Sequence, residues 1–150
     1  MIEPIENSLH YFGRCDECNE TCTGPRWCKS CNSIHFRKAF STWTSGNLEI
    51  DYFIQNTQLH ATSVGQALEW FPWEVFSDVK KIGEGGYGIV FRAKRTENAG
   101  FISRWDKQNN EWYRVKKGEY YYNEYVALKT TDSNDPLKEV IFFDLLRVNA

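Results

Sequence analysis

The chain has 150 residues, of which 41% are hydrophobic and 25% are charged, and its formal net charge is −2. These values are typical of a globular protein of one or two small domains. The nearly neutral charge gives no electrostatic reason to expect nucleic acid or an anionic membrane as a partner. The N-terminus, MIEPIENSLH, lacks the basic start and apolar run of a secretory signal, and no apolar run is long enough to cross a bilayer, so we expect a cytoplasmic protein.

Residues 1–32 contain all five cysteines of the chain. Four of them form two Cys-x-x-Cys knuckles, Cys15 with Cys18 and Cys28 with Cys31. Paired knuckles in a chain without a signal favour a metal site over disulfides, and four thiolates suit a tetrahedral zinc ion. We therefore predict a zinc knuckle held by these four cysteines, with the metal stabilising a segment too small for a core. Cys22 is left as a free thiol or as a substitute for one of the four ligands, and nearby His35 is expected to be a packed or surface residue.

Residues 33–72 carry helical patterns, and we expect them to form a helical lead-in. The apolar residues of a first helix fall on one face: Ile34, Phe36, Phe40 and Trp43. A break at 45–47 leaves Asn47 as the N-cap of a second helix, with acidic residues in its first turn, where the helix dipole favours them. The buried stripe of this second helix is expected at Ile50, Phe53, Ile54 and Leu59. A third short helix is expected over 63–71, before a proline.

Residues 73–150 alternate like strands around a glycine cluster, which predicts a strand, a tight turn and a second strand. The segment Trp105–Trp112, with aromatic residues on either side of a polar stretch, predicts a hairpin tip. Tyr120–Leu128 is rich in tyrosine and valine and predicts another strand. We expect a final helix from Pro136, since a proline suits the first helical turn. The apolar stripe of that helix would be Val140, Phe143 and Leu146.

The glycine cluster reads Gly83-Glu84-Gly85-Gly86-Tyr87-Gly88-Ile89-Val90 and fits the pattern G-x-G-x-x-G-x-V. Glycines let backbone amides approach a polyphosphate closely. The pattern alone is weak, because a plain hairpin turn or a dinucleotide-binding turn would also fit. A dinucleotide-binding turn needs a helix after the last glycine, whereas a strand pattern follows here, and no Lys-Ser or Lys-Thr follows as in a P-loop. The later segment Val126-Ala127-Leu128-Lys129 fits a strand that supplies a phosphate-binding lysine.

Together these segments resemble the N-terminal lobe of eukaryotic-type protein kinases. The resemblance covers residues 76–150 and implies an α+β fold in which the cysteine module and a helical hairpin precede three antiparallel strands and helix C. It implies an ATP site made by Ile82, Gly83, Glu84, Gly85, Gly86, Tyr87, Gly88, Ile89, Val90, Ala127 and Lys129. Glu139, at the position of the helix C glutamate, would pair with Lys129. The Cys-rich leader with the segment Trp43–Asn47 also resembles the lead-in of a large fungal group of kinases.

Two features depart from this family. Residues 96–125 form a long insertion within the lobe of residues 73–150, expected to be an extended hairpin whose aromatic residues pair across the strands or dock a partner. The chain also lacks the His-Arg-Asp and Asp-Phe-Gly motifs, so we expect a truncated piece that binds ATP, with magnesium in a full-length kinase, without transferring phosphate by itself. The full reaction would phosphorylate serine, threonine or tyrosine of a protein substrate. The alternative is a non-catalytic, pseudokinase-like adaptor that binds a protein through the zinc knuckle and the aromatic hairpin.

Overall fold

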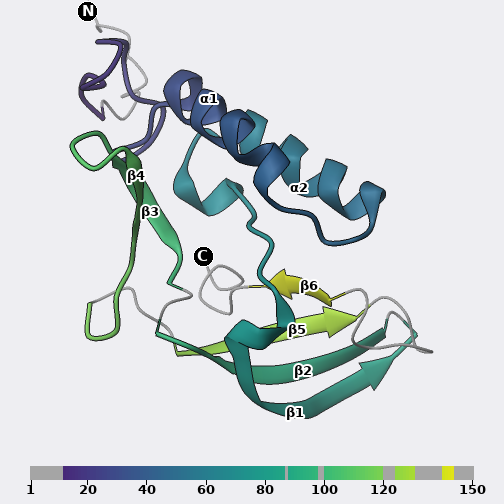
Figure 1. Ribbon diagram of the computed structural model, residues 1–150. Helices are drawn as coiled ribbons and strands as arrows, with labels where there is room; N and C mark the ends of the chain where they lie inside the picture. The colour runs from purple at the N-terminus through teal and green to yellow at the C-terminus, as the bar shows by residue number, and fades with distance from the viewer. Residues whose placement is uncertain (1–11, 87, 98–99, 120–123, 131–139, 144–150) are drawn as a thin grey trace, which may run out of the picture.

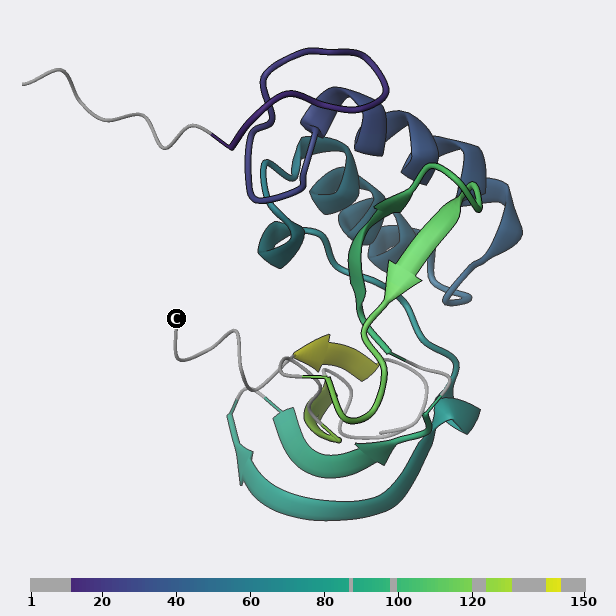
Figure 2. The same cartoon turned by 90° about the vertical axis from the view of Figure 1, so that its left-hand side faces the viewer.

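The computed structural model describes residues 12–86, 88–97, 100–119, 124–130 and 140–143 (Figure 1). These residues form two α-helices, a two-stranded antiparallel sheet and a four-stranded antiparallel sheet, so the predicted α+β class is confirmed. The helices and the small sheet pack together at one end of the molecule, and the four-stranded sheet lies at the other (Figure 1, Figure 2). Among the residues described, no helix has the length and the apolar character needed to span a bilayer.

The helical part consists of α1 (Lys29–Ala39) and α2 (Leu48–His60), with a 3₁₀ turn, η1 (Phe40–Thr42), after the first helix. The two helices pack side by side, as the predicted helical hairpin requires (Figure 1). α1 begins inside the cysteine-rich segment, since Cys28 is its N-cap and Cys31 lies in its first turn. The second knuckle is therefore part of a helix N-terminus and not of a separate loop.

The buried faces of these helices differ from the predicted stripes. Phe36 on α1 and Ile54 on α2 are buried as expected, but Ile34 and Phe53 are 49% and 53% exposed. The polar residues buried on the two helices are Asn32, Asp51 and Gln58. Gln58 donates from Nε2 to a backbone oxygen of the segment after α2 at 2.7 Å, so this buried amide group has a hydrogen-bond partner. Apolar spacing alone cannot identify a helix face that also carries hydrogen-bonded polar residues.

The turn before α2 is tied to that helix by Asp51. The Asp51 carboxylate accepts hydrogen bonds from Oγ1 of Thr44 at 2.5 Å, and from the backbone N and Oγ of Ser45 at 2.7 and 2.5 Å. Asn47 is the N-cap of α2, as predicted, because its side chain accepts from two backbone amides of the first turn. These bonds fix the direction in which the chain enters α2.

The third helix predicted over 63–71 is wrong. That segment contains a single 3₁₀ turn, η2 (Val64–Gln66), and another, η3 (Trp73–Val75), follows it. Gly65 disfavours a helix because it loses more backbone entropy than other residues do. The Gln66 side chain accepts from the backbone N and Oγ1 of Thr62 at 2.9 and 3.0 Å, which closes the turn on itself. The segment serves as the connection between the helices and the large sheet.

The four-stranded sheet has the order β1-β2-β5-β6, and all its neighbouring strands are antiparallel. Its strands are β1 (Phe76–Gly85), β2 (Gly88–Arg95), β5 (Tyr125–Thr130) and β6 (Val140–Phe143). The predicted order of strand, glycine turn, strand and Val-Ala-Leu-Lys strand is confirmed. The helix predicted beyond Pro136 is wrong at residues 140–143, which pair with β5 as a strand. The run Val-Ile-Phe-Phe is β-branched or aromatic throughout, which favours a strand, and so short an apolar run fits either type.

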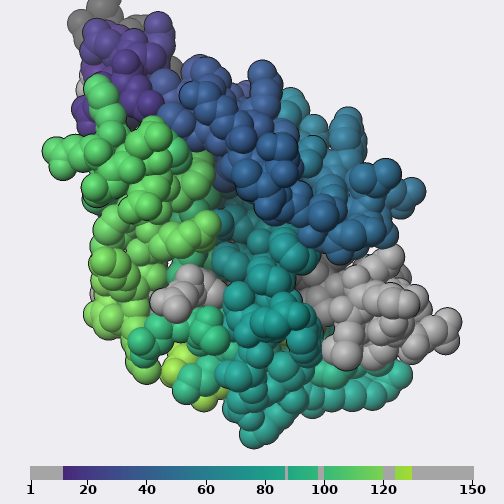
Figure 3. All heavy atoms as spheres, in the orientation of Figure 1, coloured from purple at the N-terminus to yellow at the C-terminus, as the bar shows by residue number. Residues whose placement is uncertain are grey.

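Between β2 and β5 the chain leaves the sheet as a hairpin of β3 (Ile102–Asp106) and β4 (Glu111–Arg114). This hairpin was predicted and is confirmed. Trp105 pairs with Trp112 across the strands, and their ring centroids lie 5.1 Å apart. The hairpin packs against the cysteine-rich loop and α1, as the contact between the green and purple-blue surfaces in Figure 3 shows.

Two consecutive residues at the base of this hairpin belong to different cores. Phe101 is buried in the core of the four-stranded sheet, together with Ala93, Val126 and Leu128. Ile102 is buried in the core of the helical part, together with Trp27, Phe36, Ala61 and Ala67. Successive side chains of an extended chain point in opposite directions, so this dipeptide can join the two cores.

An ion pair fixes the same point of the chain. Arg114 Nη2 lies 2.8 Å from Oε1 of Glu69, and Arg114 Nη1 donates to the carbonyl oxygen of Gly100 at 2.9 Å. The other carboxylate oxygen of Glu69 accepts from the backbone N of Ile102 at 3.3 Å. A Cβ at Gly100 would lie 2.0 Å from the carbonyl oxygen of Val115, so the close approach of the segments before β3 and after β4 requires glycine there.

Replacement of Ile102 by alanine should lower the free energy of unfolding by about 2–5 kcal/mol, because it leaves a cavity in a core. Ile102 is 2% exposed, whereas Ile34 is 49% exposed. The matched change Ile34→Ala should therefore alter the free energy of unfolding by less than about 1 kcal/mol. Urea denaturation of both variants measures the difference, and equal losses would contradict the central position of Ile102.

Stability should also fall in acid because of Asp51. Burial raises the pKa of this carboxyl, but hydrogen bonds from Ser45 and Thr44 outweigh burial and hold the pKa below its ordinary value. A carboxyl with a lower pKa in the folded chain contributes stability above its unfolded pKa of about 3.9, and this contribution is lost as the pH falls through the folded pKa. Urea denaturation at a series of pH values below about 5 should show a smaller loss in Asp51→Asn, whose amide does not titrate. An unchanged acid loss in that variant would exclude Asp51 as its source.

Candidate functional site

The two Cys-x-x-Cys knuckles come together at one end of the helical part. The first knuckle lies in a tight turn, in which the backbone N of Asn19 donates to the carbonyl oxygen of Cys15 at 2.9 Å. The backbone N of Glu17 donates to Sγ of Cys15 at 3.4 Å and orients that sulfur. The second knuckle is the start of α1, with Cys28 as N-cap and Cys31 in the first turn. A turn and a helix N-terminus therefore each hold two thiols in a fixed position.

The four sulfur atoms form a set that can hold a metal ion. The Sγ atoms of Cys15, Cys18, Cys28 and Cys31 all lie within 4.8 Å of one another. The separation of Cys15 from Cys31 is 3.8 Å and that of Cys18 from Cys28 is 3.7 Å. Metal–sulfur bonds of about 2.3 Å in a tetrahedron place the sulfurs about 3.8 Å apart, whereas a disulfide bond is about 2.05 Å long. The arrangement fits tetrahedral coordination, and all five cysteines, each of which the structure describes, are free of disulfides.

These thiols need a cation before all four can ionise. Burial raises the pKa of Cys28 and that of Cys31 above the ordinary thiol value. The backbone amide of Glu20 stabilises the Cys18 thiolate and lowers the pKa of that thiol. A divalent ion would supply the missing positive charge and displace the remaining protons. Metal affinity should therefore decrease as the pH falls.

Two residues near the knuckles are not part of this set. The sequence left Cys22 as either a free thiol or a fourth ligand. Cys22 lies outside the four clustered sulfurs, which favours the free thiol. His35 is a packed residue, as predicted: its Nε2 lies 2.9 Å from both carboxylate oxygens of Glu17. The ring of His35 also stacks on Trp105, with 3.6 Å between centroids. His35 thereby connects the first knuckle to the β3–β4 hairpin.

The packing of the inserted hairpin on the cysteine module was not foreseen from the sequence. Trp112 stacks on Trp27 and Phe36, with centroid distances of 5.8 and 4.5 Å. Lys107 Nζ donates to the backbone oxygen of Asp16 at 2.8 Å. Trp27, which is fully buried, donates from its indole nitrogen to a backbone oxygen after α2 at 3.0 Å. The only sign of these contacts in the sequence is the high aromatic content of 16%, since contacts between distant segments leave no local pattern.

The glycine-rich segment forms the tight turn between β1 and β2. Gly85 pairs with Gly88 across the turn, and Gly88 has a φ of 113°, which other residues rarely adopt. Among the described residues, no atom lies within 4 Å of a Cβ placed on three of its glycines: Gly83, Gly85 and Gly86. Tyr87 lies outside the described residues. A side chain at these three positions would therefore meet no described neighbour.

The strand register brings three of the predicted ATP-site residues to one face of the sheet. Val90 pairs directly with Lys129, and Arg92 pairs with Ala127. Residues that pair directly, and residues two apart in one strand, point to the same face, so Val90, Ala127 and Lys129 share a face. The other face carries the buried residues Ala93, Val126 and Leu128. The shared face is thus the one opposite the core of the sheet.

The remaining predicted ATP-site residues lie beside the turn or outside the described residues. Ile82 lies at a register shift in β1 and is 58% exposed. Glu84 is exposed and forms an ion pair with a lysine of β1, and it pairs across the turn with the half-buried Ile89. Glu139 lies outside the described residues, so its pairing with Lys129 stays a prediction. The helix expected to carry Glu139 is absent at residues 140–143, where β6 is found.

No protein-family model, curated protein or solved structure matches this chain. Two features of the described residues carry recognisable chemistry: the cluster of four thiols and the strand-flanked glycine turn with its lysine. Function is therefore inferred from these two sites.

The metal content of cysteine variants should distinguish the four clustered cysteines from Cys22. We expect about one tightly bound divalent metal ion per chain, and the change of Cys18 to serine should remove most of it, because three thiolates leave the tetrahedron incomplete. Cys18 is exposed, so this change removes little packing. Cys22→Ser is the matched control and should keep the metal. Inductively coupled plasma mass spectrometry measures the content, and equal metal loss in both variants, or a metal-free wild-type protein, would refute the four-thiol site.

Proposed function

We propose that the chain is the ATP-binding N-terminal part of a protein kinase, preceded by a zinc-stabilised module. The main support is the register of β2 and β5, which puts Val90, Ala127 and Lys129 on one face of the sheet, next to the glycine turn. A glycine pattern or a strand lysine alone would carry little weight. An ATP site requires both a glycine turn and a lysine nearby, and the pairing of Val90 with both Gly83 and Lys129 supports this proposal.

Each of these residues has a role in the proposed site. The amides of the glycine turn would cover the phosphates, since glycine allows close approach of the backbone to an anion. Lys129 would contact the α- and β-phosphates. The small side chain of Ala127 would leave room for the flat adenine, and the exposed apolar side chain of Ile82 would pack on it. Burial of such apolar surface by a ligand is favourable.

ATP binding, and not phosphate transfer, is the activity that we propose for these residues. Protein kinases take their catalytic base from the His-Arg-Asp motif and a magnesium ligand from the Asp-Phe-Gly motif. The 150 residues contain neither motif. A complete kinase would add these groups and a serine, threonine or tyrosine acceptor.

Zinc is the metal that we propose for the four-thiol cluster. Thiolate ligands in a tetrahedral arrangement suit zinc, and a site closed by four protein ligands has a structural role. Among the described residues of the knuckle segment, 12–32, the buried hydrophobic ones are Trp27 and Cys28, so this part has little core of its own. Zinc binding would therefore contribute directly to folding of the segment.

The alternative of an adaptor that binds a partner through the aromatic hairpin has less support. Trp105 and Trp112 would have to be available to the partner. Instead, the first stacks on His35 and the second stacks on Trp27 and Phe36. The aromatic residues of the hairpin thus serve packing within the chain.

Addition of ATP with Mg²⁺ should raise the melting temperature, because a ligand that binds only the folded state stabilises it, by about 2.7 kcal/mol at 100 times Kd. The change of Lys129 to methionine should remove most of this shift, since the phosphates lose their cation. Lys38→Met is the matched control, because Lys38 is an exposed lysine in the last turn of α1, outside the four-stranded sheet, and it should keep the shift. Differential scanning fluorimetry measures all three proteins. Equal shifts in the two variants, or none in the wild type, would contradict the proposed site.

A further inference from the structure

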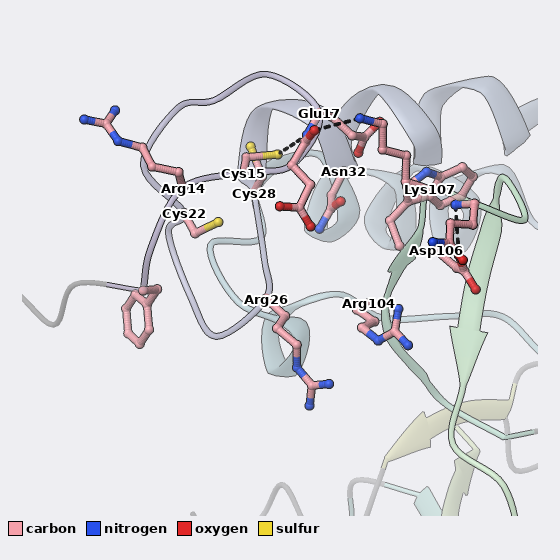
Figure 4. Close-up of a pocket in the computed structure, with 14 residues that line it drawn as sticks. Arg14, Cys15, Glu17, Cys22, Arg26, Cys28, Asn32, Arg104, Asp106 and Lys107 are labelled. Carbon is pink, nitrogen blue, oxygen red and sulfur yellow. Dashed lines mark hydrogen bonds between the residues drawn. The ribbon is translucent and has the colours of Figure 1, made fainter.

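A cavity of about 550 Å³ lies between the first knuckle and the β3–β4 hairpin (Figure 4). Its walls are the loop that carries the knuckle cysteines and the hairpin segment Arg104–Gln108, and Asn32 of α1 lies at its inner end. A volume of this size is typical of sites that hold a small ligand or a short piece of peptide. The proposed ATP site on the four-stranded sheet does not use this space.

The first observation that indicates a ligand in this cavity is the buried side chain of Asn32. It is 3% exposed, and its Nδ2 has no hydrogen-bond partner among the described residues. Figure 4 shows its amide directed into the space between the knuckle loop and the hairpin. A buried N–H donor without a partner costs about 1–3 kcal/mol. A ligand oxygen in the cavity would supply the missing acceptor.

Two of the three carboxylates that line the cavity have partners, whereas two of its arginines form no ion pair among the described residues. Glu17 is paired with His35, and Asp106 accepts from three N–H groups of its own turn. Arg26 and Arg104, in contrast, form no ion pair with any residue in the described ranges. The third carboxylate of the lining, on Asp16, is exposed in the turn of the first knuckle.

Arg104 is held in place without loss of its donors, whereas Arg26 is exposed. Arg104 lies over the ring of Tyr113, with its Cζ 4.7 Å from the centroid, which leaves its N–H groups available. Arg26 and Arg104 both lie along the lower, open side of the cavity in Figure 4, with Asn32 above them. Arg26, Arg104 and Asn32 all line this one cavity.

The negative charge of a metal bound by four thiolates would not explain why these two arginines line the cavity. Zinc with four thiolates carries a charge of about −2. Two other cations lie at the first knuckle: Arg14 donates to the backbone oxygen of Asn19 at 3.2 Å, and Lys107 donates to that of Asp16 at 2.8 Å. Arg26 and Arg104 lie on the side of the cavity away from Cys15 (Figure 4). What remains without a partner in the cavity is mainly a set of donors.

We propose that this cavity binds an oxyanion carried by a peptide, namely a phosphate or carboxylate side chain. Arg26 and Arg104 bind the charge through their paired N–H groups, and Nδ2 of Asn32 donates to an oxygen of the ligand. The site is separate from the four-stranded sheet, so it stands or falls independently of ATP binding.

Three peptides of the form acetyl-Ala-Ala-X-Ala-Ala-amide test this site, with phosphoserine, glutamate or serine at X. They are titrated into the purified chain by isothermal calorimetry, with the metal content measured separately. At least one charged peptide should bind about tenfold or more tightly than the serine peptide, because charge-assisted bonds are the stronger ones. Preference for phosphoserine alone assigns a phosphate, preference for glutamate alone assigns a carboxylate, and preference for both assigns oxyanions in general. Equal affinity for all three peptides, or no binding, overturns the proposal.

Variants then locate the binding. Arg26→Asn and Arg104→Gln should each weaken binding of the charged peptide by about tenfold or more, and asparagine suits the φ of 51° at position 26. Arg37→Gln, on the exposed end of α1 outside the cavity, is the matched control and should bind as the wild type does. Unchanged affinity in both cavity variants overturns the proposal.

Asn32→Leu separates ligand binding from a purely structural role. Replacing an unsatisfied buried donor by an apolar group should leave the melting temperature unchanged or raise it, while the affinity for the charged peptide falls. A lower melting temperature with unchanged affinity would mean that Asn32 only supports the fold, and would remove it from the site.

Discussion

The arrangement of this protein depends on the dipeptide Phe101–Ile102, whose side chains lie in two different cores. Consecutive Cα atoms are about 3.8 Å apart, so the two cores cannot separate without exposing one of these side chains. The ion pair between Arg114 and Glu69, with its bond to the backbone oxygen of Gly100, holds the same point. The helical part and the four-stranded sheet are therefore joined by packing as well as by the chain.

This joint gives a physical connection between the four-thiol cluster and the glycine turn. Trp27 lies next to Cys28 in the sequence and stacks on Trp112 of the hairpin, and His35 stacks on Trp105. The hairpin arises from β2 and returns into β5, the strands that carry Val90 and Lys129. Loosening of the knuckles would thus remove contacts that hold the hairpin, and the base of the hairpin is part of the core under β2 and β5. Any effect of the metal on ligands of the sheet would follow this route, and it would be reciprocal.

The sequence predicted those features whose cause is local. The spacing of the cysteines, the N-cap at Asn47 and the turn between β1 and β2 each depend on a few neighbouring residues, and all are found. The features that it did not predict depend on distant partners. Residues 140–143 form a strand because β5 offers them backbone hydrogen bonds, and Ile34 is exposed because no described helix or strand covers it. The contact of His35 with Trp105 joins segments with no common pattern, so no periodicity could have revealed it.

The three buried polar residues on the helices differ in whether hydrogen bonds within the protein explain their burial. Asp51 is held by Thr44 and Ser45, and this explains its position at the start of α2. Gln58 has one atom without a partner, Oε1, but its Nε2 fastens the segment that follows α2. The Nδ2 of Asn32 has neither kind of explanation among the residues described, and Asn32 alone of the three lines the cavity at the knuckles. Folding gains nothing from an unsatisfied donor, so its position at that cavity, with two arginines that form no ion pair among the described residues, supports the proposed ligand.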